Sequence, residues 1–166
     1  MKILTIDIET SPHLSFHWRR WQENIPRANT IAESQILCWA AKWHGKKPVM
    51  FSSTWDTDFE SMMEELWQLM DEADVIVGFN SDKFDIKRIN SEFLRLGWGA
   101  PSPYQKIDLF KQTKKHFNFS SNRLKDLLKE LGLSPKLEDN ANMQLWMDVV
   151  YAKRKAAMRR MKAYNI

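Results

Sequence analysis

The chain has 166 residues, 43% hydrophobic and 28% charged, a composition that excludes a disordered or fibrous protein. No apolar run approaches the ~20 residues that cross a bilayer, and Met1 leads straight into strand pattern, so we expect a cytoplasmic protein with no membrane partner. The formal net charge of +4 favours an anionic partner such as nucleic acid, and without a dividing linker we expect residues 1–166 to form one domain.

The first predicted strand, residues 1–10, carries two carboxylates on one face. Side chains alternate along a strand, so Asp7 and Glu9 project the same way, roughly 7 Å apart, while Leu4, Ile6 and Ile8 face the other way. Two like charges at this distance favour a bound cation, and oxygen ligands suit Mg²⁺ or Mn²⁺. The first hypothesis is a metal-dependent enzyme that acts on phosphate esters. The alternative is a strand end whose acids face water.

The next elements predict an antiparallel start to the sheet. Apolar runs at residues 36–43 and 49–52 read as two strands joined by the turn at residues 44–48. Cys38 has no disulfide partner and should be a buried, inert thiol, and the four histidines lack zinc-ligand spacing. A capping-box pattern at residues 57–60 then predicts a helix from Phe59 to about residue 71.

The second half predicts parallel strands and more helices. Residues 74–79 form a short apolar run typical of a central parallel strand. The helix that follows this run ends at Gly97. Ser120 or Ser121 should cap a third helix, and Asn140 a final helical stretch from residue 141 onward. We therefore expect an α/β fold with a mixed central sheet, three antiparallel strands followed by parallel ones, flanked by helices.

The segment after the parallel strand supplies a third acid. Asp85 falls in the first turn of the second helix, where the helix dipole favours a negative charge. It can face the carboxyl end of the sheet, the edge where open α/β folds place their ligands. Asp85 is therefore a candidate to join the two carboxylates of the first strand.

Two motifs carry a resemblance to a known family. Asp-Ile-Glu-Thr at residues 7–10 and Asn-x-x-x-Phe-Asp at residues 80–85 resemble the first two motifs of the DEDD (DnaQ-like) 3′-to-5′ exonucleases, which have a ribonuclease H-like fold. The resemblance implies that Asp7, Glu9 and Asp85 hold two Mg²⁺ or Mn²⁺ ions beside the scissile phosphate. One ion would activate water, and the other would support the leaving oxygen.

The third motif of that family is only half present. The residues up to Tyr164 resemble the lead-in to its tyrosine form, but the expected aspartate would stand two positions beyond Ile166. The resemblance implies that Tyr164 orients the attacking water, and the alternative is an aromatic that packs beside Ala157 and Met161. We expect an incomplete C-terminal helix, and weak or absent hydrolysis by the 166-residue form.

Candidate substrate contacts surround these motifs. A single nucleic-acid strand needs cations for its phosphates and flat faces for its bases. The predicted nucleic-acid-binding residues are Thr10, Trp18, Arg19, Asn80 and Phe84. The alternatives are a partly buried loop at residues 16–21 whose tryptophans pack on the sheet, a helix-entry cap at residue 80, and an aromatic that packs under the site at residue 84.

Further charged residues have weaker interpretations. Lys83, Lys87 and Arg88 could meet phosphate, but exposed helix charges are usually only solvated. The basic residues between 153 and 162 form either a solvated face or a nucleic-acid track. Asp108 and Asp126 are interpreted as structural or peripheral.

The function expected from this resemblance is hydrolysis of single-stranded or frayed 3′ ends, DNA favoured, with release of nucleoside monophosphates. No residue visible in the sequence must contact a 2′-hydroxyl, so RNA stays open. The sequence leaves the protein's own protein partners unidentified. One alternative is a non-catalytic nucleic-acid-binding or inhibitory protein that keeps the exonuclease fold, and a second is an endonuclease or resolvase on the same fold.

Overall fold

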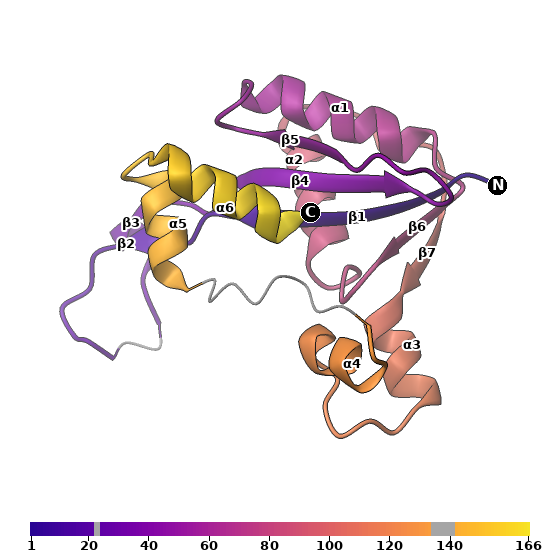
Figure 1. The fold of residues 1–166 in the computed structure, drawn as a ribbon. Helices are drawn as coiled ribbons and strands as arrows, with labels where there is room; N and C mark the ends of the chain where they lie inside the picture. Colours follow the sequence, from indigo (N-terminus) through magenta and orange to yellow (C-terminus); the bar gives the residue numbers. More distant parts are fainter. Residues whose placement is uncertain (22–23, 134–141) are drawn as a thin grey trace.

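A five-stranded mixed sheet forms the centre of the protein in the computed structural model, which describes residues 1–21, 24–133 and 142–166. The strand order is β5-β4-β1-β6-β7 (Figure 1). The strands are β1 (Ile3–Thr10), β4 (Ile36–Trp43), β5 (Met50–Ser53), β6 (Val75–Gly78) and β7 (Gln105–Asp108). Strands β1, β4 and β5 pair antiparallel, and β6 and β7 run parallel to β1. The predicted mixed sheet is confirmed.

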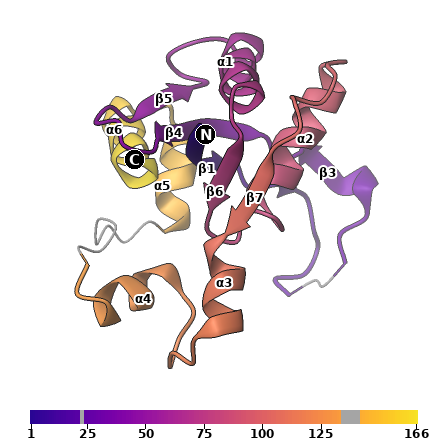
Figure 2. The ribbon, with the colours of Figure 1, turned by 90° about the vertical axis from the view of Figure 1, so that its right-hand side faces the viewer.

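Helices cover both faces of this sheet. Helices α1 (Phe59–Asp71) and α2 (Asp85–Arg95) lie on one face, and α5 (Met143–Val150) and α6 (Lys155–Asn165) lie on the other (Figures 1 and 2). Helices α3 (Leu109–His116) and α4 (Leu124–Glu130) stand beyond the end of β7, and a short second sheet pairs β2 (Leu14–Ser15) with β3 (Thr30–Ala32) after the turn η1 (Arg27–Asn29). Within the described residues, no helix is long and apolar enough to cross a membrane.

Side chains of β1 alternate between the two faces of the sheet, and an apolar cluster lies on each face. Leu4, Ile6 and Ile8 are buried in a cluster with the apolar stripes of α1 and α2. On the opposite face, Leu37 and Cys38 of β4 pack with the apolar residues of α5 and α6. The intervening residues of β1, which include both carboxylates, therefore face the layer that α5 and α6 form.

Helix α1 follows the pattern expected from the sequence. The side chain of Asp58 accepts a hydrogen bond from the backbone nitrogen of Ser61 at 2.9 Å, which satisfies one free donor of the first turn. The helix buries a stripe of methionines and one leucine against the sheet: Met62, Met63, Leu66 and Met70. The predicted bounds of this helix are confirmed.

Two predicted helix starts differ in the structure. Helix α4 begins after Arg123, which makes no side-chain cap, while the hydroxyl of Ser121 donates to Asp126 instead. The predicted final stretch is two helices, α5 and α6, separated where Lys153 adopts a positive φ of 48°. A positive φ interrupts the helical hydrogen-bond ladder, so the chain turns there. The proposed cap at Asn140 lies outside the described residues.

Candidate carboxylate site

The pairing of β1 places its two acids at the carboxyl end of the parallel strands. Strand β1 pairs with β6 only over residues 3–5, so Asp7 and Glu9 extend past the end of that partner. On the other side they stand opposite Ala40 and Cys38 of β4. Both carboxylate residues are partly buried and share the face on which α5 and α6 pack. This is the edge where open α/β folds bind ligands.

Asp85 comes to the same place from α2. It is the first residue of that helix, and its side chain is almost fully buried, with 5% exposure. Its Oδ1 accepts a hydrogen bond at 3.2 Å from the backbone nitrogen of Ile8, the residue between Asp7 and Glu9. A buried carboxylate is costly unless it is hydrogen-bonded, and this bond fixes it beside β1. The bond thus brings Asp85, 77 residues away in the chain, to the strand residue that separates Asp7 from Glu9.

The end of α6 joins the site through Asn165, which the sequence analysis missed. Asn165 is 3% exposed, and its Nδ2 donates to Oδ2 of Asp7 at 3.1 Å and to the carbonyl oxygen of Asp7 at 3.3 Å. The available signal was its position: Ala157, Met161 and Asn165 recur every four residues on the buried stripe of α6. An amide on such a stripe needs a buried partner.

Tyr164 is held next to this contact. Its ring meets that of Trp146 edge-on, with centroids 6.0 Å apart and planes 76° apart, and both side chains border the cluster of α5 and α6. The packing alternative raised for Tyr164 is therefore present in the structure. Because Asn165 follows directly, the same tyrosine also lies at the point where α6 reaches Asp7.

The loop between β6 and α2 is organised by Asp108. Asp108 ends β7, is 3% exposed, and its carboxylate accepts bonds from the backbone nitrogens of Asn80 at 2.8 Å, Asp82 at 3.3 Å and Phe110 at 3.0 Å. Asn80 has a φ of 60°, a conformation that asparagine tolerates better than most residues. Asp108 is therefore structural, as expected, and it sets the path of the chain toward Asp85.

Asp82 attaches the same loop to α3. Its carboxylate forms ion pairs with Lys111 of α3 and Lys106 of β7. The hydrogen bond from Lys111 and the charge of Lys106 hold the pKa of Asp82 below its ordinary value, although burial acts in the opposite direction. The loop before Asp85 is thus fixed from two sides.

Three of the five candidate substrate residues, Trp18, Arg19 and Phe84, are exposed. The side chain of Trp18 is fully exposed at 100%, Trp21 is exposed at 88%, and Arg19 is also exposed. The alternative in which these tryptophans pack on the sheet is therefore wrong. Phe84, at the start of α2, is 48% exposed, so it does not pack under the site, whereas Thr10 at the end of β1 is partly buried.

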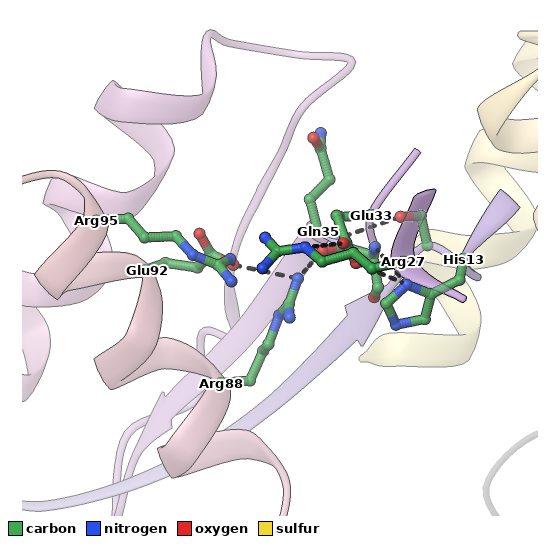
Figure 3. A network of polar contacts seen from close by, with 9 residues as sticks. His13, Arg27, Glu33, Gln35, Arg88, Glu92 and Arg95 are labelled. Carbon is green, nitrogen blue, oxygen red and sulfur yellow. Dashed lines mark hydrogen bonds and ion pairs between the residues drawn. The ribbon is translucent and has the colours of Figure 1, made fainter. Parts of the chain in front are cut away.

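Arg88 has a structural partner rather than a free guanidinium (Figure 3). Its Nη2 donates to the carbonyl oxygen of Ser34 and pairs with Glu92 at 3.2 Å, and Glu92 also pairs with Arg95 at 2.8 Å. Next to Ser34, the backbone of Gln35 exchanges hydrogen bonds with Ser11, just beyond the end of β1. The network therefore connects α2 to the segment that follows Glu9. Arg88 is thus neither a phosphate contact nor a solvated charge, the two roles considered for it from the sequence.

Comparison with known proteins identifies the fold family. The sequence pattern of the RNase H superfamily matches residues 32–166, more than three quarters of the chain. The chain belongs to the RNase H superfamily. Asp85 and Tyr164 lie inside the matched residues, and Asp7 and Glu9 precede them. A search of curated protein sequences found no match.

A solved structure agrees with this RNase H superfamily assignment. The family B DNA polymerase from the hyperthermophilic archaeon Pyrobaculum calidifontis superposes with a TM-score of 0.70 over 98% of this chain, at 15% sequence identity. The match covers 22% of the polymerase chain, so this chain spans about a fifth of that protein's length. At this identity the likeness shows the fold, and the predicted ribonuclease H-like fold is confirmed.

The RNase H superfamily includes nucleases, which generally use divalent metals. Within the described residues, no group of three or more histidine, cysteine, aspartate or glutamate side chains has the geometry of a metal site. The donor chemistry nevertheless fits Mg²⁺ or Mn²⁺, because Asp7, Glu9 and the buried Asp85 offer only oxygen atoms at one end of the sheet. What connects Asp85 to the strand of Asp7 and Glu9 is its hydrogen bond to the backbone of Ile8.

Proposed function

We propose that this protein is a metal-dependent 3′-to-5′ exonuclease of the tyrosine branch of the DEDD family. It hydrolyses the terminal phosphodiester bond of single-stranded or frayed 3′ ends, with DNA favoured, and releases nucleoside monophosphates. The observation that carries the proposal is the position of Asp85: a buried carboxylate bonded to the strand residue between Asp7 and Glu9. Membership of a superfamily that includes nucleases supports it.

The residues of the site have distinct proposed roles. Asp7, Glu9 and Asp85 hold two Mg²⁺ or Mn²⁺ ions, which, when bound, lower the pKa of water and stabilise charge on the phosphate. Asn165 fixes the orientation of the Asp7 carboxylate through its amide. Tyr164, one residue earlier on α6, orients the attacking water.

The proposed substrate path uses exposed groups between β2 and η1 and at the start of α2. Trp18 offers a flat face to a base and Arg19 a cation to a phosphate, and both are exposed. Phe84, half exposed at the start of the helix that carries Asp85, gives a second stacking face. Asn80 and Thr10, which border the same edge of the sheet, contact the terminal nucleotide.

The test is shortening of a 5′-labelled single-stranded oligonucleotide in Mn²⁺. Because the fourth carboxylate is absent from these 166 residues, we expect a slow ladder of products that lack 3′ nucleotides. The rate should be at least about 100-fold lower again for Asp85→Asn, since metal stabilisation of the transition state amounts to several kcal/mol. The control is Glu64→Gln, an exposed carboxylate of α1, which should leave the rate unchanged. Equal rates for wild type and Asp85→Asn would contradict the proposal.

A second candidate is a nucleic-acid-binding or inhibitory protein without catalysis. It is favoured by the lack of a metal-site geometry among the residues that the structure describes. In that case the oligonucleotide would bind in EDTA and stay at full length in Mn²⁺. Cleavage of a circular single strand would instead indicate an endonuclease.

A further inference from the structure

One side of α6 carries a row of exposed cations. Lys155, Arg159 and Lys162 follow one another at intervals of four and three residues, so they share one stripe of the helix. All three side chains are exposed. We call these three residues the α6 basic face.

The α6 basic face borders a hollow that contains an aromatic ring. The hollow has a volume of about 330 Å³ and is lined by the basic face together with Trp55, Asp56 and Met158. Trp55 also borders a second hollow, of about 480 Å³, that Lys153 and Met158 help to line. Trp55 packs against Phe51 with ring centroids 6.1 Å apart, which leaves it half-buried and fixed between the two hollows.

The charges in this hollow are available to an anion. Among the residues that the structure describes, Lys155 and Arg159 form no ion pair, and the ammonium of Lys162 lies 4.6 Å from the centre of the Phe51 ring. The acid that lines the hollow, Asp56, accepts a hydrogen bond from the hydroxyl of Ser53 at 2.7 Å. The local charge is therefore positive beside an accessible indole.

This surface lies apart from the carboxylate site. Tyr164 is nine residues from Lys155, which at about 100° per residue places it on the opposite side of α6. The basic face instead borders Phe51 of the edge strand β5 and the two residues Trp55 and Asp56 that follow it. A ligand here does not need the carboxylates or their metal.

We propose that the α6 basic face and Trp55 form a second binding surface for a single nucleic-acid strand. The phosphates of the strand lie on Lys155, Arg159 and Lys162, and one base stacks on Trp55. Cations that track a backbone beside a fixed aromatic ring are the combination that binds single strands without sequence preference. The proposal rests on the proposed function for the choice of nucleic acid, and it adds a contact outside the catalytic site.

The test measures binding separately from cleavage. A 5′-fluorescein-labelled dT20 oligonucleotide is titrated in EDTA and followed by fluorescence anisotropy. The triple variant K155Q/R159Q/K162Q should bind about tenfold more weakly or worse, and its salt slope should fall by about 2, since each single-strand phosphate contact contributes about 0.7. The matched control K46Q/K47Q/K125Q removes three exposed lysines elsewhere and should keep the wild-type salt slope.

A second variant tests the base contact. Trp55→Leu keeps an apolar side chain in the hollow and should weaken binding about tenfold, the lower range of a lost base stack. Circular dichroism and thermal unfolding confirm that each variant is folded. Equal weakening by both triple variants, or no binding by the wild type in EDTA, would overturn the proposal.

Cleavage in Mn²⁺ separates this proposal from the proposed function. If the oligonucleotide is cleaved but its binding does not depend on the α6 basic face, the second surface is refuted and the exonuclease proposal stands. If binding depends on the α6 basic face but no cleavage is seen, the second surface is supported and the exonuclease proposal is refuted.

Discussion

At the scale of single residues, Asn165 is the contact that connects α6 to the carboxylates. Asn165→Ala removes both hydrogen bonds to Asp7. We expect the free energy of unfolding to fall by about 1–3 kcal/mol, because a bond to a charged group is lost in a buried position. Mn²⁺ affinity should fall about 10- to 100-fold, as for other partners that orient a metal ligand. Urea unfolding and Mn²⁺ titration measure the two effects.

The control for this prediction is Ala163→Ser, an exposed position on the same helix. It should change neither quantity. A wild-type Mn²⁺ affinity in Asn165→Ala would show that the amide does not orient Asp7.

A second prediction at this scale concerns Gly78. A Cβ at Gly78 would lie 2.5 Å from both Cβ and Oγ of Ser81, a buried residue of the loop that leads to Asp85. Gly78→Ala should therefore displace this loop and cost about 1–3 kcal/mol of unfolding free energy. Gly99→Ala, with no atom within 4 Å of the new Cβ, should be close to neutral. Chemical denaturation of both variants checks this, and equal stabilities would contradict it.

Some residues of the site could be predicted from sequence and others could not. Asp7 and Glu9 follow from the period of two in a strand, and Asp85 from its place where a strand meets a helix. Asn165 was missed because its partner is 158 residues away and its own neighbourhood is a plain amphipathic helix. The exposure of Trp18 was also out of reach, since it depends on the path of a loop.

At the scale of elements, the orientation of α2 depends on a buried ion pair. Arg88→Met removes the ion pair with Glu92, whose side chain is 6% exposed. It also removes the hydrogen bond from Arg88 to the carbonyl oxygen of Ser34. We expect a loss of about 2 kcal/mol, because hydrogen bonds to charged groups contribute about 1.5–3 kcal/mol and Glu92 keeps its contact with Arg95. Arg95→Met removes a cation from the same glutamate, but the Arg95 side chain is 60% exposed, so the loss should stay below about 1 kcal/mol. Urea unfolding compares the variants, and equal losses would contradict the account.

Elements with strong periodicity could be predicted, and short polar ones could not. Helix α1 has both a cap and an apolar stripe, and it was placed at the correct residues. Strand β7 is exposed except for Asp108, so it lacks the apolar pattern that marks a strand, and α3 after it buries no residue. The break between α5 and α6 depends on one positive φ at a lysine, which no local pattern announces.

At the scale of the whole molecule, topology brings the candidate site together. Strand β1 lies between an antiparallel and a parallel neighbour, so its acids face α6 while Asp85 arrives from the β6–α2 connection. The order of strands and helices was sufficient to predict that Asp85 reaches the strand that carries Asp7 and Glu9. The detailed positions of the carboxylate oxygens were not predictable, because they depend on hydrogen bonds such as those from Ile8 and Asn165.

The proposed function requires Asp7, Glu9 and Asp85 to bind divalent metal together. Its most direct test is a Mn²⁺ titration followed by the electron paramagnetic resonance signal of the free ion. Wild-type protein should take up Mn²⁺. Asp85→Asn, whose amide oxygen can still accept the bond from Ile8, should bind at least about tenfold more weakly while staying folded. Equal uptake by the two proteins, or none by the wild type, would contradict it.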